Sequence, residues 1–264
     1  MCELLGINSK KRLQVNEYLR EFYHHSEKHC HGWGQATFYG DAVQVEKEPI
    51  KADSSNYLHS RLEHPFEVNN LIAHIRLASV GRMKYENCHP FVKHDNRGRS
   101  WTLAHNGTIF NPQISQEVSL DSFKSVQEGE TDSERILFYL IDCINERQEE
   151  LGRALKAEER FSLLDQQISM ISIGNKLNLL IWDGEFMYAH TNYADTLSFK
   201  QIGNAETVVI STLPLDNEDW QPVPFLQLQV FKQGELVWQG MHRSQQFFDK
   251  EKDWEYKNFD YATL

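Results

Sequence analysis

Met1-Cys2-Glu3-Leu4-Leu5-Gly6-Ile7-Asn8-Ser9 is the stretch from which the interpretation of the whole chain starts. It mixes apolar and small residues and leads into Asn-Ser-Lys-Lys, a pattern that predicts a strand running into a turn. The side chain of Cys2 is small enough for routine removal of Met1, which leaves a thiol and a free α-amine on one residue. An α-amine titrates near pH ~8 and a thiol near ~8.5, so the amine can take the thiol proton around neutral pH without a separate histidine base. The alternative is a buried, inert cysteine that happens to follow Met1.

Length and composition favour one domain. The chain has 264 residues, of which 40% are hydrophobic, so it can bury a substantial core, and we expect a single domain over residues 1–264 with Cys2 as the mature N-terminus. The 38 acidic and 27 basic side chains give a net charge of -11, which disfavours nucleic acid and anionic membranes as partners. The sequence has no signal peptide and no run of about 18 apolar residues, so we expect a soluble, cytoplasmic protein.

The cysteines and histidines raise the question of a metal. The four cysteines contain no Cys-x-x-Cys pair, which predicts free thiols in place of a zinc ribbon or a disulfide framework. The stretch from His24 to His31 holds several histidines and Cys30, and His25 and His29 would share one face of a helix. No carboxylate or further Cys/His cluster supplies an obvious closed ligand set. We therefore expect no metal. The interpretation that we favour over a metal site is that these are exposed histidines near a loop.

Local patterns predict a β-rich first half. Residues 33–39, 70–78 and 101–105 are predicted strands, separated by polar stretches. A short amphipathic helix is expected after the first strand, because apolar residues recur at helical spacing: Leu13, Val15, Tyr18, Leu19 and Phe22.

The second half combines helices with hairpins. Thr131 and Glu134 form a capping-box signature, which predicts a helix over residues 132–147, and a second helix is expected over 157–171. Asp183-Gly184 suits a tight turn between strands 177–182 and 186–190. Further strands are expected over 207–211 and, as a hairpin, over 225–239. The last two dozen residues carry no pattern that we can interpret.

Several segments together resemble the class II glutamine amidotransferases in order and spacing. They occupy roughly the first half of the chain and are Cys2-Glu3-Leu4-Leu5-Gly6, His31-Gly32-Trp33-Gly34, Ala73-His74-Ile75-Arg76-Leu77-Ala78-Ser79, Asn87-Cys88-His89-Pro90-Phe91, Leu103-Ala104-His105-Asn106-Gly107 and Gly129-Glu130-Thr131-Asp132-Ser133-Glu134. The resemblance implies an α+β fold of the N-terminal nucleophile hydrolase type, a four-layer α-β-β-α sandwich. The strand and helix pattern is compatible with this topology but does not select it.

The resemblance also assigns catalytic roles. Attack of the Cys2 thiolate on an amide forms an oxyanion, which hydrogen-bond donors must meet. Asn106 can offer its side-chain NH2 and Gly107 its backbone N–H, and the resemblance gives both positions this role. The alternative is that Asn-Gly is only a β-turn after a strand.

Two charged residues suit the α-groups of a free amino acid. Arg76 can grip a carboxylate through two parallel hydrogen bonds, whereas a structural ion pair is its other explanation. The resemblance implies that Asp132 binds the α-ammonium of the substrate. Its other explanation is a carboxylate that stabilises the start of a helix through the helix dipole. Ser79 and His89 match positions that line the glutamine pocket of relatives, and His89 could equally order the turn at residues 87–90. His31 departs from the family, where an aspartate more often precedes Gly-Trp-Gly, so no role is carried over to it.

The implied reaction needs no cofactor. Cys2 attacks the side-chain amide of glutamine, ammonia leaves, and water hydrolyses the γ-glutamyl thioester. The chain is too short to hold the second catalytic domain of biosynthetic members beside the hydrolase. Either a separate synthetase subunit docks, or the enzyme alone cleaves another γ-glutamyl amide or peptide. Two other readings stay open, namely another cysteine-first amidase resembling bile-acid or penicillin amide hydrolases, and an inactive binding or regulatory relative.

Overall fold

Strand β1 (Glu3–Gln14) lies in the middle of a seven-stranded antiparallel sheet in the computed structural model, which describes residues 2–40, 42–78, 81–244 and 246–247. The order of the strands in this first sheet is β11-β9-β10-β1-β4-β2-β3. Its other members are β2 (Trp33–Tyr39), β3 (Ala42–Glu48), β4 (Glu67–Ile75), β9 (Ser198–Ile202), β10 (Thr207–Ser211) and β11 (Gln221–Pro222).

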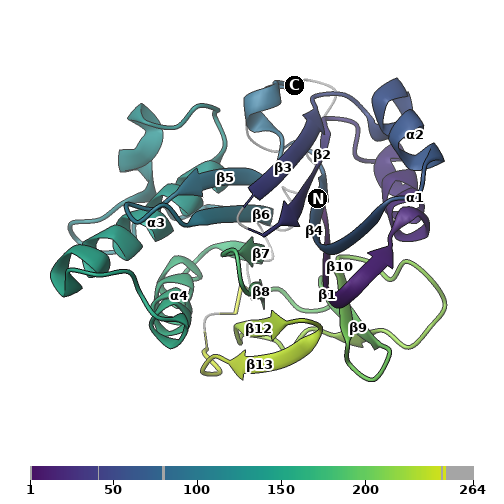
Figure 1. The fold of residues 1–264 in the computed structure, drawn as a ribbon. Coiled ribbons are helices and arrows are strands. Elements are labelled where there is room, and N and C mark those ends of the chain that lie inside the picture. Colours follow the sequence, from purple (N-terminus) through teal and green to yellow (C-terminus); the bar gives the residue numbers. More distant parts are fainter. Residues whose placement is uncertain (1, 41, 79–80, 245, 248–264) are drawn as a thin grey trace.

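The second sheet is also antiparallel and has six strands in the order β13-β12-β8-β7-β6-β5. They are β5 (Phe91–His94), β6 (Ser100–Thr108), β7 (Lys176–Trp182), β8 (Met187–Thr191), β12 (Gln229–Lys232) and β13 (Glu235–Gln239). Helices α1 (Asn16–His24) and α2 (Asn56–Glu63) cover the outer face of the first sheet, and α3 (Asp132–Leu151) and α4 (Ala157–Ile171) cover that of the second (Figure 1). The predicted α+β sandwich with α-β-β-α layers is confirmed.

Successive side chains of β1 point alternately into two hydrophobic cores, which explains why this strand is apolar on both faces. Leu4 packs in the core between the sheets with Leu180, whereas Leu5 and Ile7 pack in a second core with Phe22 of α1. Successive side chains of a strand point to opposite faces, so a central strand of a four-layer sandwich is buried on both. A third core lies between the second sheet and helices α3 and α4.

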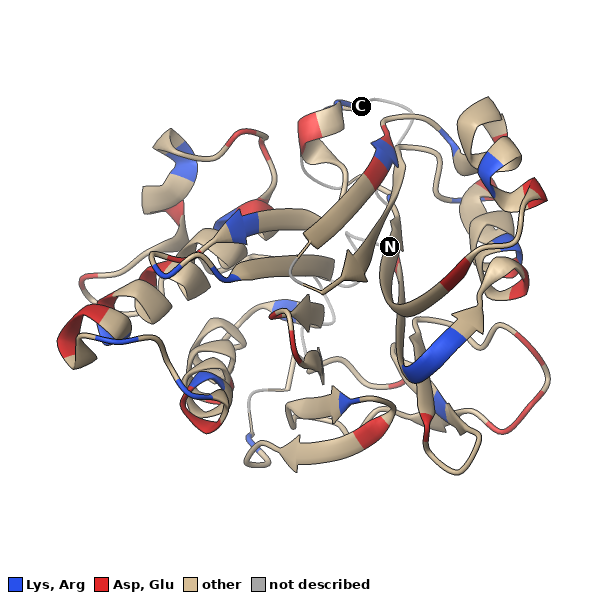
Figure 2. Cartoon of the chain, in the orientation of Figure 1, with Lys and Arg blue, Asp and Glu red and all other residues tan. Residues whose placement is uncertain are grey.

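Charged residues lie mainly on the helices, the loops and the strand ends (Figure 2). The predicted turn at the end of the first strand is wrong, because β1 continues to Gln14. Its pairing with β4 changes register between Asn8 and Leu13, and the exposed Lys10 and Lys11 pair with Glu206. Leu13, expected in the helix, therefore belongs to the strand.

The predicted helices are confirmed, with one change at the start of α3. Thr131 is its N-cap, and its hydroxyl accepts the Glu134 N–H at 3.3 Å. The Glu134 carboxylate accepts from Glu128 and Gly129 in place of completing the box at Thr131, so the Glu134 side chain holds the preceding loop. Helix α4 has the predicted limits, and α3 continues to Leu151. No described helix combines the length and apolarity needed to cross a bilayer.

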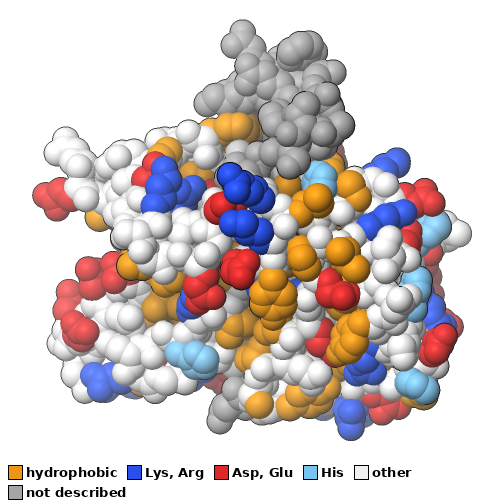
Figure 3. Space-filling model, turned by 90° about the horizontal axis from the view of Figure 1, so that it is seen from above, with side chains coloured by type: hydrophobic (Ala, Val, Ile, Leu, Met, Phe, Trp, Pro, Cys, Tyr) orange, Lys and Arg blue, Asp and Glu red, His pale blue; other side chains and the backbone are white. Residues whose placement is uncertain are grey.

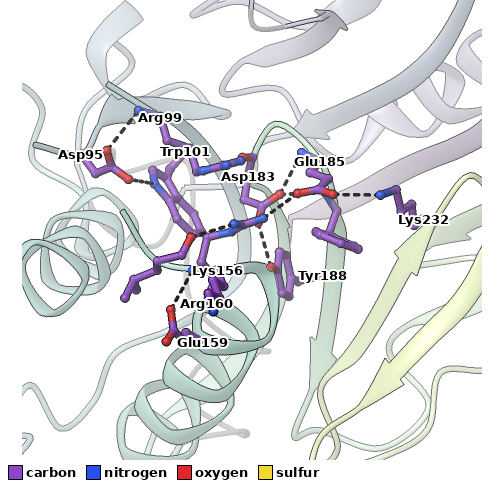
Figure 4. Close-up of polar contacts among 12 residues, drawn as sticks. Asp95, Arg99, Trp101, Lys156, Glu159, Arg160, Asp183, Glu185, Tyr188 and Lys232 are labelled. Atoms are coloured by element: carbon purple, nitrogen blue, oxygen red, sulfur yellow. Dashed lines mark hydrogen bonds and ion pairs between the residues drawn. The ribbon is translucent and has the colours of Figure 1, made fainter. Parts of the chain in front are cut away.

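The hairpin at Asp183-Gly184 is confirmed, and a buried ion pair anchors it to α4 (Figure 4). Arg160 Nε lies 2.7 Å from Asp183 Oδ2, and Tyr188 donates its hydroxyl to the same oxygen at 2.8 Å. Arg160 also forms an ion pair with Glu185, and Glu185 forms a second ion pair with Lys232 of β12. The network joins α4 to the β7–β8 turn and to strands β8 and β12 of the second sheet, far along the chain from Cys2.

Candidate active site

Cys2 precedes β1 and its sulfur rests against the end of the neighbouring strand β4. The Leu77 N–H donates to Cys2 Sγ at 3.3 Å, and Sγ lies 3.4 Å from the Leu77 carbonyl oxygen. Burial raises the pKa of the Cys2 thiol, while the Leu77 hydrogen bond and the charge of Arg76 act in the opposite direction. Because a protonated thiol is a poor nucleophile, this sulfur requires a base before it can attack a carbonyl.

His31 fixes the segment that contacts the sulfur. Its N–H donates to the Arg76 carbonyl at 3.0 Å, the Arg76 N–H donates to Gly32 at 2.8 Å, and the Ala78 N–H donates to His31 Nδ1 at 2.9 Å. Burial and the nearby Arg76 charge lower the pKa of His31, which keeps Nδ1 available as an acceptor. His31, to which the sequence assigns no role, therefore holds the backbone on either side of Leu77.

Arg76 is 2% exposed, and its guanidinium is oriented by main-chain oxygen atoms. Nη1 donates to the Arg82 carbonyl at 3.1 Å and Nη2 to the Gly81 carbonyl at 2.8 Å. Burial lowers the pKa of Arg76, whereas Cys2 and Asp132 raise it. A guanidinium stays protonated in proteins, so this position places a cation close to the thiol.

Asp132 is the first residue of α3 and is 7% exposed. Its Oδ2 accepts the Ile109 N–H at 2.8 Å, and Oδ1 accepts the Ser133 N–H at 2.9 Å. Thr131 is the N-cap, and Asp132 lies in the first turn of α3, where its carboxylate also favours the start of the helix. The bond to Ile109 ties the helix to the end of β6, where Asn106 lies.

Asn106 and Gly107 lie inside β6, paired with Asn178 and Leu177 of β7, so the interpretation of Asn-Gly as a turn is wrong. Asn106 is fully buried, and its Nδ2 donates to Thr212 Oγ1 at 3.4 Å, whereas no described residue bonds its Oδ1. The same Thr212 hydroxyl accepts the Leu4 N–H at 2.9 Å. Asn106 is therefore linked from the second sheet through the Thr212 hydroxyl to β1, the strand that begins beside Cys2.

The glycine at position 107 is required by a close approach of two strands. A Cβ there would lie 1.9 Å from the Lys176 carbonyl oxygen and 2.5 Å from His105 Nε2. Both distances are far inside van der Waals contact, so β6 and β7 pair at this point only because position 107 has no side chain.

His89 packs among other rings behind the site. Its ring stacks on that of His74 with 4.0 Å between centroids, and none of the described residues bonds its nitrogen atoms. Burial lowers the pKa of both histidines well below the usual range, so they are neutral. Within the described part of the chain, the His89 side chain therefore makes no hydrogen bond that would order the turn at residues 87–90. Ser79 lies outside the described residues.

The carboxylate of Glu3 lies beside the histidine-rich stretch, a contact that the sequence does not predict. Glu3, next to Cys2, is 4% exposed, and its carboxylate lies 2.8 Å from His25 Nδ1 and 3.6 Å from His29 Nε2. Among the described ranges, no three His, Cys, Asp or Glu side chains are grouped as metal ligands. The link between Glu3 and the histidines has no sequence signal, because it depends on how α1 packs on β1.

A hollow of about 440 Å³ lies at the far end of the sandwich from Cys2. It is lined by Asn8, Lys10, Arg12 and Lys232 among others, and none of the candidate site residues lines it. On the face seen from above, acidic, basic and hydrophobic side chains are intermixed (Figure 3). The described residues on this face form no broad basic surface of the kind that binds nucleic acid.

Comparisons with known proteins agree with the fold and indicate a family. The family Glutamine amidotransferases class-II matches residues 1–201. An uncharacterized protein of Methanocaldococcus jannaschii is 34% identical over 263 residues, covering 90% of this chain and 71% of that protein. The Escherichia coli protein named "Putative glutamine amidotransferase YafJ" is 28% identical, covering 90% of this chain and 100% of that protein. Glutamine phosphoribosylpyrophosphate amidotransferase from B. subtilis is similar in fold, with a TM-score of 0.64 at 18% identity over 89% of this chain and 48% of that chain.

Proposed function

The chain belongs to the class II glutamine amidotransferases, and from this premise we propose that Cys2, uncovered by removal of Met1, attacks the side-chain amide of glutamine. The observation that carries the proposal is the position of the Cys2 sulfur, which lies against Leu77 next to a buried Arg76. The charges of Arg76 and Asp132 shift the pKa of Cys2 in opposite directions, which supports a site that combines a thiol, a cation and an anion.

Substrate binding uses the two charged residues. The Arg76 guanidinium binds the α-carboxylate of glutamine, and the Asp132 carboxylate binds its α-ammonium. Asp132 accepts two backbone bonds and a longer one from the Ser133 hydroxyl at 3.4 Å, and an ionised carboxylate with about four lone-pair sites retains acceptor capacity beyond these three. The family resemblance assigns the positions of Ser79 and His89 to the glutamine pocket, and we carry this assignment over as part of the proposal.

The chemistry then follows from the state of the thiol. The free α-amine of Cys2 takes the thiol proton, and the thiolate attacks the γ-carbonyl carbon. The Asn106 side-chain NH2 and the Gly107 N–H stabilise the oxyanion, and the proton held by the amine passes to the departing nitrogen, which leaves as ammonia. Water then attacks the thioester carbonyl, the α-amine of Cys2 takes a proton from this water and returns it to the departing sulfur, and glutamate leaves with the thiol restored. The two steps need no cofactor.

The fate of the ammonia distinguishes two forms of this function. In one, a separate synthetase subunit accepts it. In the other, the protein acts alone on a γ-glutamyl amide or peptide that is larger than glutamine. Assays of ammonia and amine release from glutamine, glutathione and other γ-glutamyl compounds separate the two forms by substrate preference.

Two measurements test the mechanism. Intact mass of the purified protein should show loss of Met1, and Cys2→Ala should abolish hydrolysis, because no other group replaces the nucleophile. Cys143→Ala is the matched control, since Cys143 lies on α3 outside the site, and it should retain activity. Full activity of Cys2→Ala would overturn the proposal. Activity that survives Arg76→Ala unchanged would favour an amidase that does not recognise an amino acid.

A further inference from the structure

The carbonyl groups that orient Arg76 belong to a loop that is itself held from outside. The Arg82 carbonyl accepts from Arg76 Nη1 at 3.1 Å and also from Asn87 Nδ2 at 2.9 Å. The Arg82 N–H donates to Glu130 Oε2 at 2.9 Å. The carbonyl of Arg82 is therefore bonded to a side chain from the turn at residue 87, and its N–H to a side chain from the loop before α3.

Asn87 joins these two loops. It is fully buried, its Oδ1 accepts the Glu130 N–H at 2.7 Å, and its Nδ2 reaches Glu130 Oε2 at 3.3 Å as well as the Arg82 carbonyl. A Cβ at Gly129 would lie 2.4 Å from Asn87 Oδ1, so the chain before α3 packs directly on this side chain. The amide therefore uses both of its ends to hold the two loops together.

Glu130 carries the connection to Asp132, which lies two residues further along the chain. Its carboxylate also accepts from Lys84 Nζ at 3.2 Å. The hydrogen bonds from the Arg82 N–H, Lys84 and Asn87 lower the pKa of Glu130 to about 2, so the carboxylate stays charged through the whole neutral and mildly acidic range. A continuous set of bonds thus runs from Arg76 through Arg82, Asn87 and Glu130 to the start of α3.

We propose that Asn87 and Glu130 are positioning residues for substrate recognition, which hold Arg76 and Asp132 at the separation that matches the α-carboxylate and α-ammonium of glutamine. The inference rests on the proposed function. Neither residue needs to contact the substrate, because they act through the two groups that do. These bonds converge on Arg76 and on the loop before α3, and none of those among the described residues reaches Cys2. Disturbing them should therefore weaken substrate binding more than it slows the chemical step.

The test is steady-state glutamine hydrolysis by Asn87→Ala and Glu130→Ala, compared with Glu130→Gln. We expect the alanine variants to raise KM roughly 10- to 100-fold, as small displacements of binding groups do, with kcat changing about threefold or less. Glu130→Gln keeps an acceptor for the Arg82 N–H and should recover much of the loss. Lys84→Ala is the control, because it removes only an exposed partner of Glu130 and should leave KM within about twofold.

Alkylation of Cys2 by iodoacetamide gives a second readout that does not require turnover. The rate without glutamine should equal that of the wild type in every variant, whereas the glutamine concentration that gives half-protection should rise in parallel with KM. Unchanged KM and half-protection in folded Asn87→Ala and Glu130→Ala would overturn the inference while leaving the proposed function intact. Equal losses in kcat and in the alkylation rate would also overturn it, because they would place the effect at Cys2. A wild-type protein that neither hydrolyses glutamine nor is protected by it would overturn both proposals.

Discussion

His190 makes a specific prediction about the acid stability of this fold. It lies in β8 and is 5% exposed, and its Nε2 is 3.3 Å from the Ser172 hydroxyl, whereas no described group bonds Nδ1. Burial lowers the pKa of His190 from 6.5 to about 4. Above pH 6.5 the ring is neutral in both the folded and the unfolded chain. As the pH falls from there toward 4, the unfolded chain takes up a proton that the folded chain excludes, so the free energy of unfolding decreases.

The size of this effect follows from the two pKa values. Since each pKa unit corresponds to about 1.4 kcal/mol, a fall from 6.5 to about 4 corresponds to roughly 3 kcal/mol lost between pH 8 and pH 4. His190→Asn should remove this loss, because asparagine does not titrate and can still bond Ser172. The other buried histidines contribute equally in both proteins and cancel from the comparison.

The assay is urea unfolding followed by tryptophan fluorescence at pH 8 and pH 4 for both proteins. The wild type should lose roughly 3 kcal/mol more than His190→Asn between the two pH values. If the two proteins lost the same free energy to within about 0.5 kcal/mol, burial would not be holding His190 neutral and the reasoning would be refuted.

Three further substitutions test particular contacts. Gly107→Ala places a Cβ 1.9 Å from the Lys176 carbonyl oxygen, so β6 must shift, and kcat for ammonia release should fall about 100-fold or more, whereas near-normal activity would contradict the oxyanion role of this strand. Asp183→Ala leaves Arg160 buried without its closest partner and should cost about 3 kcal/mol in urea unfolding, and a loss below about 1 kcal/mol would show that Glu185 compensates. Thr131→Ala removes the cap of α3 and should lower the free energy of unfolding by about 1 kcal/mol, whereas Thr131→Ser should restore it.

Elements with a strong local pattern were predictable, and those defined by their neighbours were not. Helix α4 and strand β10 have the predicted limits, because helical spacing and a β-branched run are properties of the segment itself. Strand β3 was missed, since it is a half-exposed edge strand of polar composition that exists through its pairing with β2. Helix α2 was missed as well, because its few buried residues, Leu58 and Leu62, form too short a pattern.

In the candidate site, likewise, the sequence indicated the residues that carry the chemistry but not the residues that position them. The resemblance singled out Cys2, Arg76, Asp132, Asn106 and Gly107, and the structure brings these positions to the adjacent ends of β1, β4, β6 and α3. The groups that hold them in place, such as His31 and Thr212, had no assigned role in the sequence. Their function depends on single hydrogen bonds to residues that are distant in the chain.

The amino-acid sequence by itself determined the family, the alternation of buried strands with amphipathic helices, and the residue types available for chemistry. The tertiary structure alone decided which of them meet: the Cys2 sulfur with Leu77, 75 positions away, and the Asn106 amide with Thr212, 106 positions away. The physical reason is that a strand pattern specifies which face is buried but not which strand lies beside it. Pairing partners and register are selected by the packing of two sheets and their helices all together, and the separation between catalytic groups is a result of that packing.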